Sequence, residues 1–214
     1  MKYENIIFDL DGTLSNSEIS ITTTLKQTFE HLGAKTPPYE TLLKFIGPPL
    51  VESFMKYCGF DKTAAINARC IYQSYFDVTG KELNVLYDGI EDLLINLKNQ
   101  GKHLYIATTK EEKASEYIVG KLGIAKYFDK LVGASKDNSL SEKCDLLKKL
   151  FAISGISPDS AVLIGDTTYD VIGARKAGID CIAVLYGYNT AEQLLNGGAN
   201  ILVKDVKTLH KLFA

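Results

Sequence analysis

The sequence has little of what nucleic-acid-binding proteins use to hold their ligands. It contains no tryptophan, and only two of its 24 basic residues are arginines, Arg69 and Arg175. The formal net charge is −2 over 214 residues. Because nucleic-acid binding depends on clustered positive charge and base recognition depends strongly on arginine, we expect no nucleic-acid partner.

Cysteine pairs and long apolar runs are also missing. The four cysteines lie far apart, without CxxC or Cys/His metal spacing, at Cys58, Cys70, Cys144 and Cys181. This pattern favours free thiols in a reducing compartment. No segment approaches the roughly 18 apolar residues of a membrane span, and the first apolar run is too short for a signal peptide. We therefore expect a cytoplasmic protein with no membrane partner.

Short apolar runs that end in Gly, Asp or Thr alternate along the chain with helical patterns. Each run has the length and composition of a strand that is buried on both faces. Such alternation predicts an α/β fold with a Rossmann-like parallel sheet and helices on both faces. The predicted strands are Asn5–Asp9, His103–Thr109, Lys130–Ala134, Ala161–Asp166, Cys181–Gly187 and Ala199–Val203.

One block interrupts this alternation. Residues 15–86 show helical patterns without a convincing strand, and they contain four of the five prolines. Ser15 followed by Glu18 has the spacing of a helix capping box. We therefore predict a core domain made of residues 1–14 and 87–214, with a small all-helical domain, residues 15–86, inserted after the first strand.

Acids, hydroxyls and a lysine stand where the predicted strands end. In open parallel sheets, ligands bind in the crevice beyond the carboxyl ends of the strands. Residues placed there from distant parts of the sequence should therefore converge on one site. They are Asp9 and Asp11 after the first strand, Thr108, Thr109 and Lys110 after the second, and Asp166 and Asp170 in "GDTTYD"; Lys143 opens the helix before that last strand.

These residues resemble the motifs of the haloacid dehalogenase-like superfamily of phosphotransferases. "DLDGT" at 9–13 resembles its first motif, Thr108 its second, Lys143 its third and "GDTTYD" at 165–170 its fourth. The helical block resembles the cap of the phosphoglycolate phosphatase-like branch. The likeness covers nearly the whole chain, and two further segments share it, "FIGPPLVESF" (45–54) and "VLYGYNTAEQL" (184–194).

The resemblance implies a role for each motif residue. Asp9 would attack phosphorus and become an aspartyl-phosphate, and Asp11 would protonate the leaving group. Thr108 would donate to a phosphate oxygen, and Lys143 would offset the growing negative charge. Repulsion between Asp9 and Asp11 is predicted to raise the pKa of one of them, which keeps an acid available at neutral pH. Further contacts to the substrate are expected from Gly12, Thr13 and Thr109.

The charge of the predicted site indicates a cation. With Asp11 protonated, three acids bring −3 and Lys143 brings +1, so a divalent cation would make the site neutral before a phosphate enters. An all-oxygen ligand set selects a hard ion, and Mg²⁺ is the expected cofactor. The family's pattern implies the ligands: Asp9, the backbone carbonyl of Asp11, Asp166 and, through water or the outer shell, Asp170.

The predicted function is a Mg²⁺-dependent phosphomonoester hydrolase, monomer or homodimer, acting on a small soluble phosphate ester. Phosphoglycolate, a nucleoside monophosphate, pyrophosphate and a sugar phosphate all remain open as substrates. A β-phosphoglucomutase-like mutase shares the core motifs. A hydrolytic dehalogenase has no use for an acid at Asp11, and a receiver-like signalling module carries its phospho-acceptor on a later strand. A binding module would require the acids to be dispensable.

Two other lysines compete with Lys143 for the third motif. Family members often have a proline after this lysine, whereas this chain has Cys144. Lys136 and Lys148 lie near enough in the sequence to take the same role.

Overall fold

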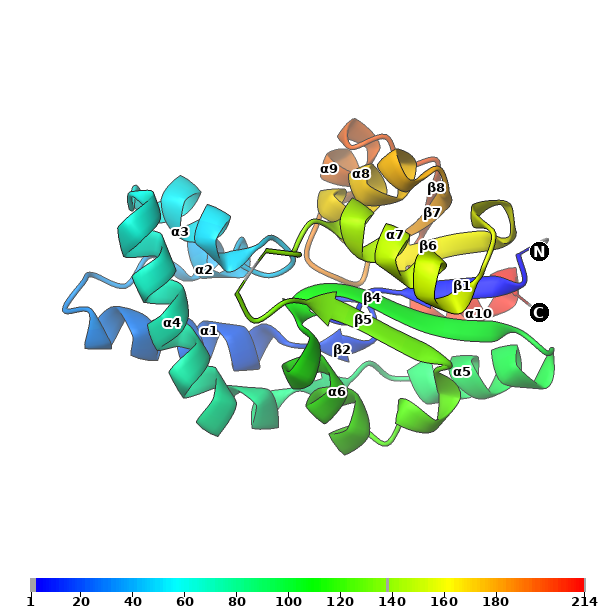
Figure 1. Ribbon diagram of the computed structural model, residues 1–214, viewed down its shortest axis with the longest axis horizontal. Helices are drawn as coiled ribbons and strands as arrows, with labels where there is room; N and C mark the ends of the chain where they lie inside the picture. Colours follow the sequence, from blue (N-terminus) through cyan, green and yellow to red (C-terminus); the bar gives the residue numbers. More distant parts are fainter. Residues whose placement is uncertain (1–2, 138, 214) are drawn as a thin grey trace.

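The computed structural model of the protein describes residues 3–137 and 139–213. It has two parts, an α/β core and a block of helices beside it (Figure 1). The core holds a six-stranded sheet in the order β5-β4-β1-β6-β7-β8, and every neighbouring pair is parallel. The predicted fold class is thereby confirmed. The strands are β1 (Asn5–Phe8), β4 (His103–Glu111), β5 (Lys130–Ala134), β6 (Ala161–Gly165), β7 (Asp180–Val184) and β8 (Ile201–Val203).

The central strand β1 is buried on both faces, which explains its continuous apolar sequence. Side chains alternate between the faces of a strand. Ile6 and Phe8 therefore join the cluster that contains residues of α5 (Ile90–Asn99), α6 (Glu112–Lys121) and α10 (Val206–Leu212). Ile7 joins the opposite cluster, with residues of α7 (Lys143–Ser154) and α8 (Thr168–Ala177). Helices thus cover both faces, as predicted.

The remaining elements of the core are short. A helix, α9 (Ala191–Asn196), contacts α8, and two 3-10 turns, η2 (Ala125–Tyr127) and η3 (Pro158–Ser160), precede β5 and β6.

The helical block lies beyond the carboxyl ends of β1 and β4 (Figure 1). Its longest helix, α4 (Lys62–Val78), is capped by Asp61, whose carboxylate accepts a hydrogen bond from the backbone N–H of Ala64. Aromatic residues pack inside the block, with Phe54 against both Phe29 and Phe45. The elements are α1 (Glu18–His31), α2 (Tyr39–Leu43), α3 (Leu50–Cys58), α4 (Lys62–Val78) and the 3-10 turn η1 (Gly80–Leu83).

Two strands that the sequence did not predict join the block to the core. β2 (Ser15–Asn16) pairs antiparallel with β3 (Val85–Leu86), so the two chain crossings lie side by side. The predicted capping box at Ser15 is wrong. Ser15 belongs to β2 and donates its hydroxyl to the carbonyl of Leu10, and the helix begins only at Glu18. Strands of two residues are too short to produce a periodic pattern, so hydrophobic periodicity could not reveal them.

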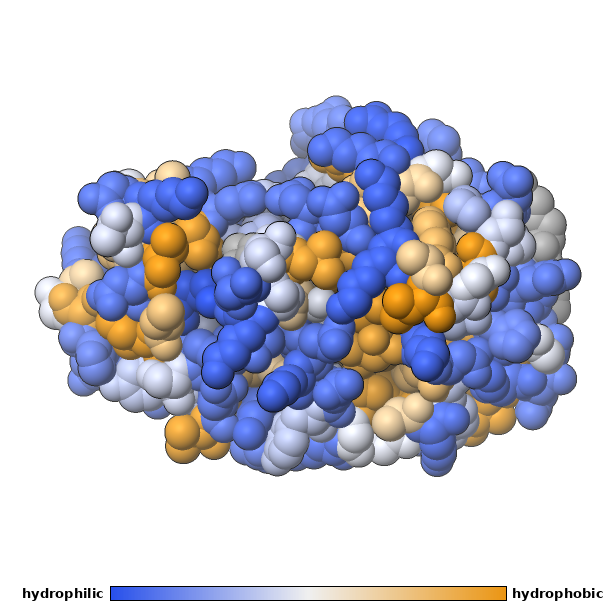
Figure 2. All heavy atoms as spheres, in the orientation of Figure 1, coloured by the Kyte–Doolittle hydropathy of each residue, from blue (hydrophilic) through white to orange (hydrophobic). Residues whose placement is uncertain are grey.

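Most apolar side chains are buried in these two parts. Figure 2 shows hydrophilic side chains over much of one face of the protein, with hydrophobic atoms in separate groups. No helix within the described residues is both long enough and apolar enough to cross a membrane.

Candidate active site

Three carboxylates meet at the carboxyl edge of the sheet. β1 and β6 are neighbours, with Phe8 opposite Ile164, so Asp9 and Asp166 follow adjacent strand ends. Asp170 joins them from the first turn of α8. One oxygen from each of the three carboxylates lies within 4.8 Å of the other two, and all three residues are buried. The structure thus brings together the three acids that the sequence placed at this edge.

Asp170 uses its two oxygens differently. Its Oδ2 accepts hydrogen bonds from the backbone N–H of Thr167 at 3.0 Å and from the Thr167 hydroxyl at 2.6 Å, which caps α8. Its Oδ1 lies 2.8 Å from Nζ of Lys143. The helix cap therefore fixes the orientation of this carboxylate and directs its second oxygen into the site.

Lys143 links the acids from the first turn of α7. Its Nζ lies 2.8 Å from Oδ1 of Asp9 and of Asp170, and it donates to the carbonyl of Ala107. Burial alone would lower the pKa of Lys143, but the carboxylates of Asp170 and Asp9 outweigh burial and raise it. This ammonium therefore stays charged. Of the competing lysines, Lys136 is exposed, and Lys148 is exposed and forms a surface pair.

Burial is the main reason why the pKa of Asp9 lies above that of an ordinary aspartate. It raises the pKa of Asp9 to about 6, against the opposing effect of Lys143 and with a further increase from Asp170. The repulsion from Asp11, which the sequence suggested as the cause, contributes least. Burial, together with Asp170 and Asp9, also raises the pKa of Asp166. Carboxyls perturbed in this way are common in functional sites.

Asp166 is fitted tightly between the loops that follow β1 and β7. Its Oδ1 accepts a hydrogen bond from the Thr13 hydroxyl at 3.2 Å, and its Oδ2 accepts one from the backbone N–H of Tyr188 at 2.8 Å. A Cβ atom on Gly12 would lie 2.2 Å from Asp166, and one on Gly187 would lie 2.3 Å away. Gly12 and Thr13, predicted to contact substrate, are thus placed against this acid.

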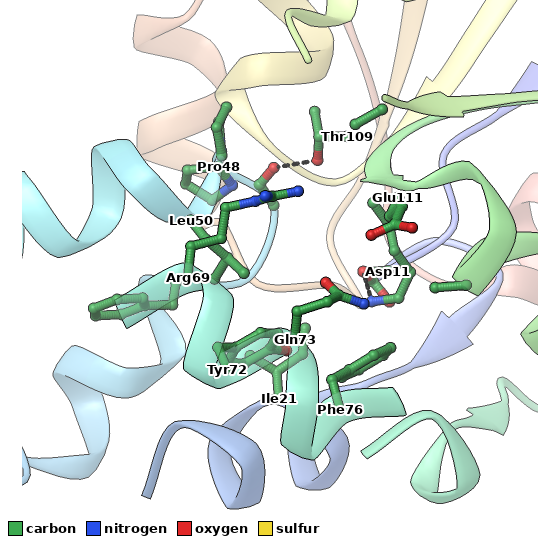
Figure 3. Close-up of a pocket in the computed structure, with 16 residues that line it drawn as sticks. Asp11, Ile21, Pro48, Leu50, Arg69, Tyr72, Gln73, Phe76, Thr109 and Glu111 are labelled. Carbon is green, nitrogen blue, oxygen red and sulfur yellow. Dashed lines mark hydrogen bonds and ion pairs between the residues drawn. The ribbon is translucent and has the colours of Figure 1, made fainter. Parts of the chain in front are cut away.

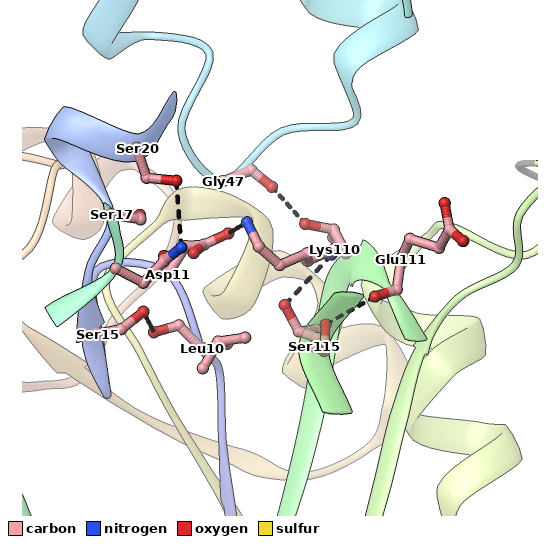
Figure 4. A network of polar contacts seen from close by, with 12 residues as sticks. Leu10, Asp11, Ser15, Ser17, Ser20, Gly47, Lys110, Glu111 and Ser115 are labelled. Carbon is pink, nitrogen blue, oxygen red and sulfur yellow. Dashed lines mark hydrogen bonds and ion pairs between the residues drawn. The ribbon is translucent and has the colours of Figure 1, made fainter. Parts of the chain in front are cut away.

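Asp11 lies outside the carboxylate cluster and pairs with Lys110 (Figure 4). The distance between Asp11 Oδ2 and Lys110 Nζ is 2.6 Å, and about a tenth of each side chain is exposed. The ammonium also lies 4.6 Å from the ring centre of Phe76, which belongs to α4. Lys110 was predicted to lie at this edge, but the sequence analysis assigned it no function. Its position directly after Thr108 and Thr109 was the only sequence feature that could have pointed to one.

The two threonines at the end of β4 have different surroundings. Thr108 is buried, and its hydroxyl accepts a hydrogen bond from the backbone N–H of Lys110 at 3.3 Å. Thr109 donates its hydroxyl to the carbonyl of Gly47, in the loop between α2 and α3, at 2.7 Å. Thr109, expected to contact substrate, thus connects the core to the helical block in this structure.

A cavity of about 60 Å³ lies between Asp11 and the helical block, which leaves room for a few water molecules. Figure 3 shows Arg69 and Gln73 of α4 directed toward the space between Thr109 and Asp11. The helical block therefore forms the lid of this cavity, which Asp11 lines on the core side. Its other walls include Ile21, Pro48, Leu50, Tyr72, Phe76, Lys110 and Glu111.

The carboxylate cluster suits a hard divalent cation. All three side chains offer oxygen, the donor that Mg²⁺ prefers. Asp9 Oδ1 and Asp170 Oδ1 are near Lys143, yet neither accepts a well-oriented hydrogen bond from any described residue. Buried carboxylate oxygens with unused lone pairs are the groups that a cation satisfies. The residues present therefore fit the ion that the sequence indicated.

Comparison with known proteins identifies the family. The family model described as haloacid dehalogenase-like hydrolase matches residues 6–184. The chain belongs to this family. This confirms the resemblance drawn from the four motifs. Similar proteins named as phosphatases and as a nucleotidase are described next.

Three similar proteins illustrate the relationship. A predicted phosphatase from Clostridium acetobutylicum has 42% identity and a TM-score of 0.96, covering 99% of this chain and 98% of that one. A 5'-nucleotidase from Pseudomonas aeruginosa is 35% identical over 91% of this chain and 88% of its own length. The tyrosine-protein kinase PtkA of Mycobacterium tuberculosis is 35% identical over 97% of this chain and 70% of its own. Phosphoglycolate phosphatases of Pseudomonas species also match, one with 27% identity.

Proposed function

We propose that the protein is a Mg²⁺-dependent phosphomonoester hydrolase that works through an aspartyl-phosphate on Asp9. The arrangement of Asp9 and Asp11 carries this proposal. Asp9 lies in the buried acidic cluster, whereas Asp11 is held away from that cluster, at the cavity under the helical block. This separation supports different roles for the two carboxylates: Asp9 would attack phosphorus, and Asp11 would serve the leaving group.

The reaction takes two steps. In the first, a carboxylate oxygen of Asp9 bonds to phosphorus, the bond from phosphorus to the ester oxygen breaks, and Asp11 gives its proton to the departing oxygen. In the second, Asp11 takes a proton from water, the water oxygen bonds to phosphorus, and the bond to Asp9 breaks. Phosphate leaves, and both aspartates return to their starting state.

Asp9, Asp166 and Asp170 are the side chains that would hold the metal, together with the backbone carbonyl of Asp11. When bound, Mg²⁺ supplies positive charge that offsets the repulsion between the acids and a phosphate dianion. Lys143 adds a fixed positive charge beside Asp9, which stabilises the charge that develops during transfer. Thr108, buried at the end of β4, would donate its hydroxyl to a phosphate oxygen.

The cavity beside Asp11 is the space in which the leaving group of the substrate would lie. The named relatives support phosphate esters of the phosphoglycolate or 5'-nucleotide type as substrates. The residues Arg69 and Gln73, on the lid side of the cavity, would contact the part of the substrate that leaves.

A phosphate-release screen tests the proposal. Wild type and Asp9→Asn are assayed with phosphoglycolate, a nucleoside monophosphate, pyrophosphate and a sugar phosphate, each with Mg²⁺ and with EDTA. We expect wild type to release phosphate in Mg²⁺ but not in EDTA. Asp9→Asn should release none under either condition. Equal turnover by the two proteins would overturn the assignment of Asp9. Conversion of a sugar 1-phosphate to its 6-phosphate without release would indicate a mutase.

A further inference from the structure

The two oxygens of the Asp11 carboxylate have different environments. Oδ2 lies 2.6 Å from Nζ of Lys110. Oδ1 is buried and accepts no hydrogen bond from any residue that the structure describes. Asp11 itself lines the cavity under the helical block. A buried carboxylate oxygen without a donor is costly, so it persists where a ligand supplies the missing partner.

Lys110 is itself held in place by both parts of the protein. Its backbone N–H donates to the hydroxyl of Thr108 in β4, and its ammonium lies over the ring of Phe76 in α4. Phe76 is buried, and the lysine side chain is 9% exposed. An ammonium over an aromatic face is attracted to the ring, and more strongly when water is excluded. The pair with Asp11 therefore depends on a contact from the helical block.

We propose that Lys110 is a positioning residue that binds Oδ2 of Asp11 and leaves Oδ1 to face the leaving group. Phe76 completes this arrangement when the helical block closes, so that Asp11 is correctly placed over a covered substrate. The proposal rests on the proposed hydrolase function and goes beyond it, because it assigns roles to Lys110 and Phe76 and selects the reacting oxygen of Asp11.

The proposal makes a prediction about leaving groups. In the transfer to Asp9, an alkoxide needs the proton of Asp11 as its bond to phosphorus breaks, whereas p-nitrophenolate leaves readily without one. A misplaced Asp11 should therefore slow an alkyl ester far more than the nitrophenyl ester. A residue that only supports the fold, or only binds phosphate, would affect both esters alike.

Benzyl phosphate and p-nitrophenyl phosphate, which are similar in size, provide the test. The quantity compared is kcat/KM, because it reports the transfer to Asp9, whereas the later hydrolysis is common to both esters. For Lys110→Met we expect a loss of about 100-fold with benzyl phosphate and less than about tenfold with p-nitrophenyl phosphate. Lys110→Arg, which keeps the charge, should restore part of the loss.

Two further variants complete the experiment. In Phe76→Leu we expect kcat/KM to fall more for benzyl phosphate than for p-nitrophenyl phosphate, by about two- to tenfold, because the variant removes the ring but keeps the charge of Lys110. Lys98→Met is the matched control: Lys98 also pairs with an aspartate, Asp129 at 3.3 Å, but it lies on the partly exposed surface of α5, and both activities should be unchanged.

The outcomes distinguish a failure of the positioning role of Lys110 from a failure of the proposed hydrolase function. Equal losses with both esters, or no loss, in Lys110→Met would overturn the positioning role. Normal behaviour of Phe76→Leu would overturn the link to closure of the helical block. Activity on p-nitrophenyl phosphate shows that each variant is folded. If wild type releases phosphate from neither ester nor from any substrate of the screen, the hydrolase function itself fails.

Discussion

Gly12 and Asp166 lie so close together that a Cβ atom on Gly12 would be 2.2 Å from Oδ2 of Asp166. One residue follows the first strand of the chain and the other follows β6, next to it in the sheet. Gly12 also has φ of +83°, a conformation that favours glycine. The glycine of "DLDGT" is therefore needed both for the turn and for the space that Asp166 occupies.

Replacement of Gly12 should abolish activity by displacing Asp166. We expect Gly12→Ala to lose phosphate release by more than about 100-fold, on the scale of a displaced metal-site or catalytic group. Gly33→Ala is the matched control, since Gly33 has φ of +60° but no neighbouring atom within 4 Å of an added Cβ. Both variants should lose about 1 kcal/mol of stability from backbone strain. Full activity in Gly12→Ala would contradict the assigned packing.

Removal of Lys143 should destabilise the metal-free protein because it leaves buried carboxylates without their cation. In EDTA at pH 7.5, urea unfolding of Lys143→Met should show a loss of about 3–5 kcal/mol. The loss should be smaller at pH 5.5, where the carboxyls can take up protons. Lys148→Met, which removes an exposed ion pair on the same helix, should change stability by less than about 1 kcal/mol. Similar losses in both variants would argue against the buried network.

The stabilisation of the folded protein by Mg²⁺ should depend on pH, because folding raises the pKa of Asp9. Asp9 has a pKa of about 6 in the folded protein, against 3.8 for an ordinary aspartate, so its protonated form is the one that folding favours. The stability from this group is fully present below pH 3.8 and is lost as pH rises through 6. This shift of about two pKa units corresponds to about 3 kcal/mol.

Mg²⁺ requires the ionised carboxyls, so it competes with protons. We expect its effect on Tm to be larger at pH 7.5 than at pH 5.5, measured by thermal unfolding at a fixed Mg²⁺ concentration. Asp9→Asn should lose much of this difference. An equal increase in Tm at the two pH values would argue against a metal at Asp9.

The hydrogen bond from Thr109 to the carbonyl of Gly47 should help to hold the helical block closed. Thr109→Val keeps the shape of the side chain but removes the donor, at a cost of about 1 kcal/mol. We expect hydrogen exchange of the backbone amides of residues 45–47 to accelerate about fivefold. The control is Thr208→Val, which removes the exposed hydroxyl that bonds to Asp205 in the first turn of α10. Unchanged exchange in Thr109→Val would show that other contacts keep the block closed.

Local patterns were sufficient to predict most of the fold. The short apolar runs became strands because a sequence buried on both faces must be apolar throughout. The spacing of Ile90, Leu93, Leu94 and Leu97 is that of one helix face, and these four side chains are the buried ones of α5. β2 and β3 were missed because each strand has only two residues. The pairing between the two strands stabilises them, and no local sequence pattern marks either one.

The same distinction applies to the site. The sequence by itself determined that Asp9, Asp11, Asp166 and Asp170 would stand near one edge, because right-handed crossovers place the carboxyl ends of parallel strands together. Only the tertiary structure decided which lysine serves which acid: Lys143 lies between Asp9 and Asp170, and Lys110 binds Asp11. Those pairings depend on distances of a few ångströms between segments about 30 to 135 residues apart. The raised pKa of Asp9 likewise results mainly from burial, which exists only once the tertiary structure has packed around the carboxyl.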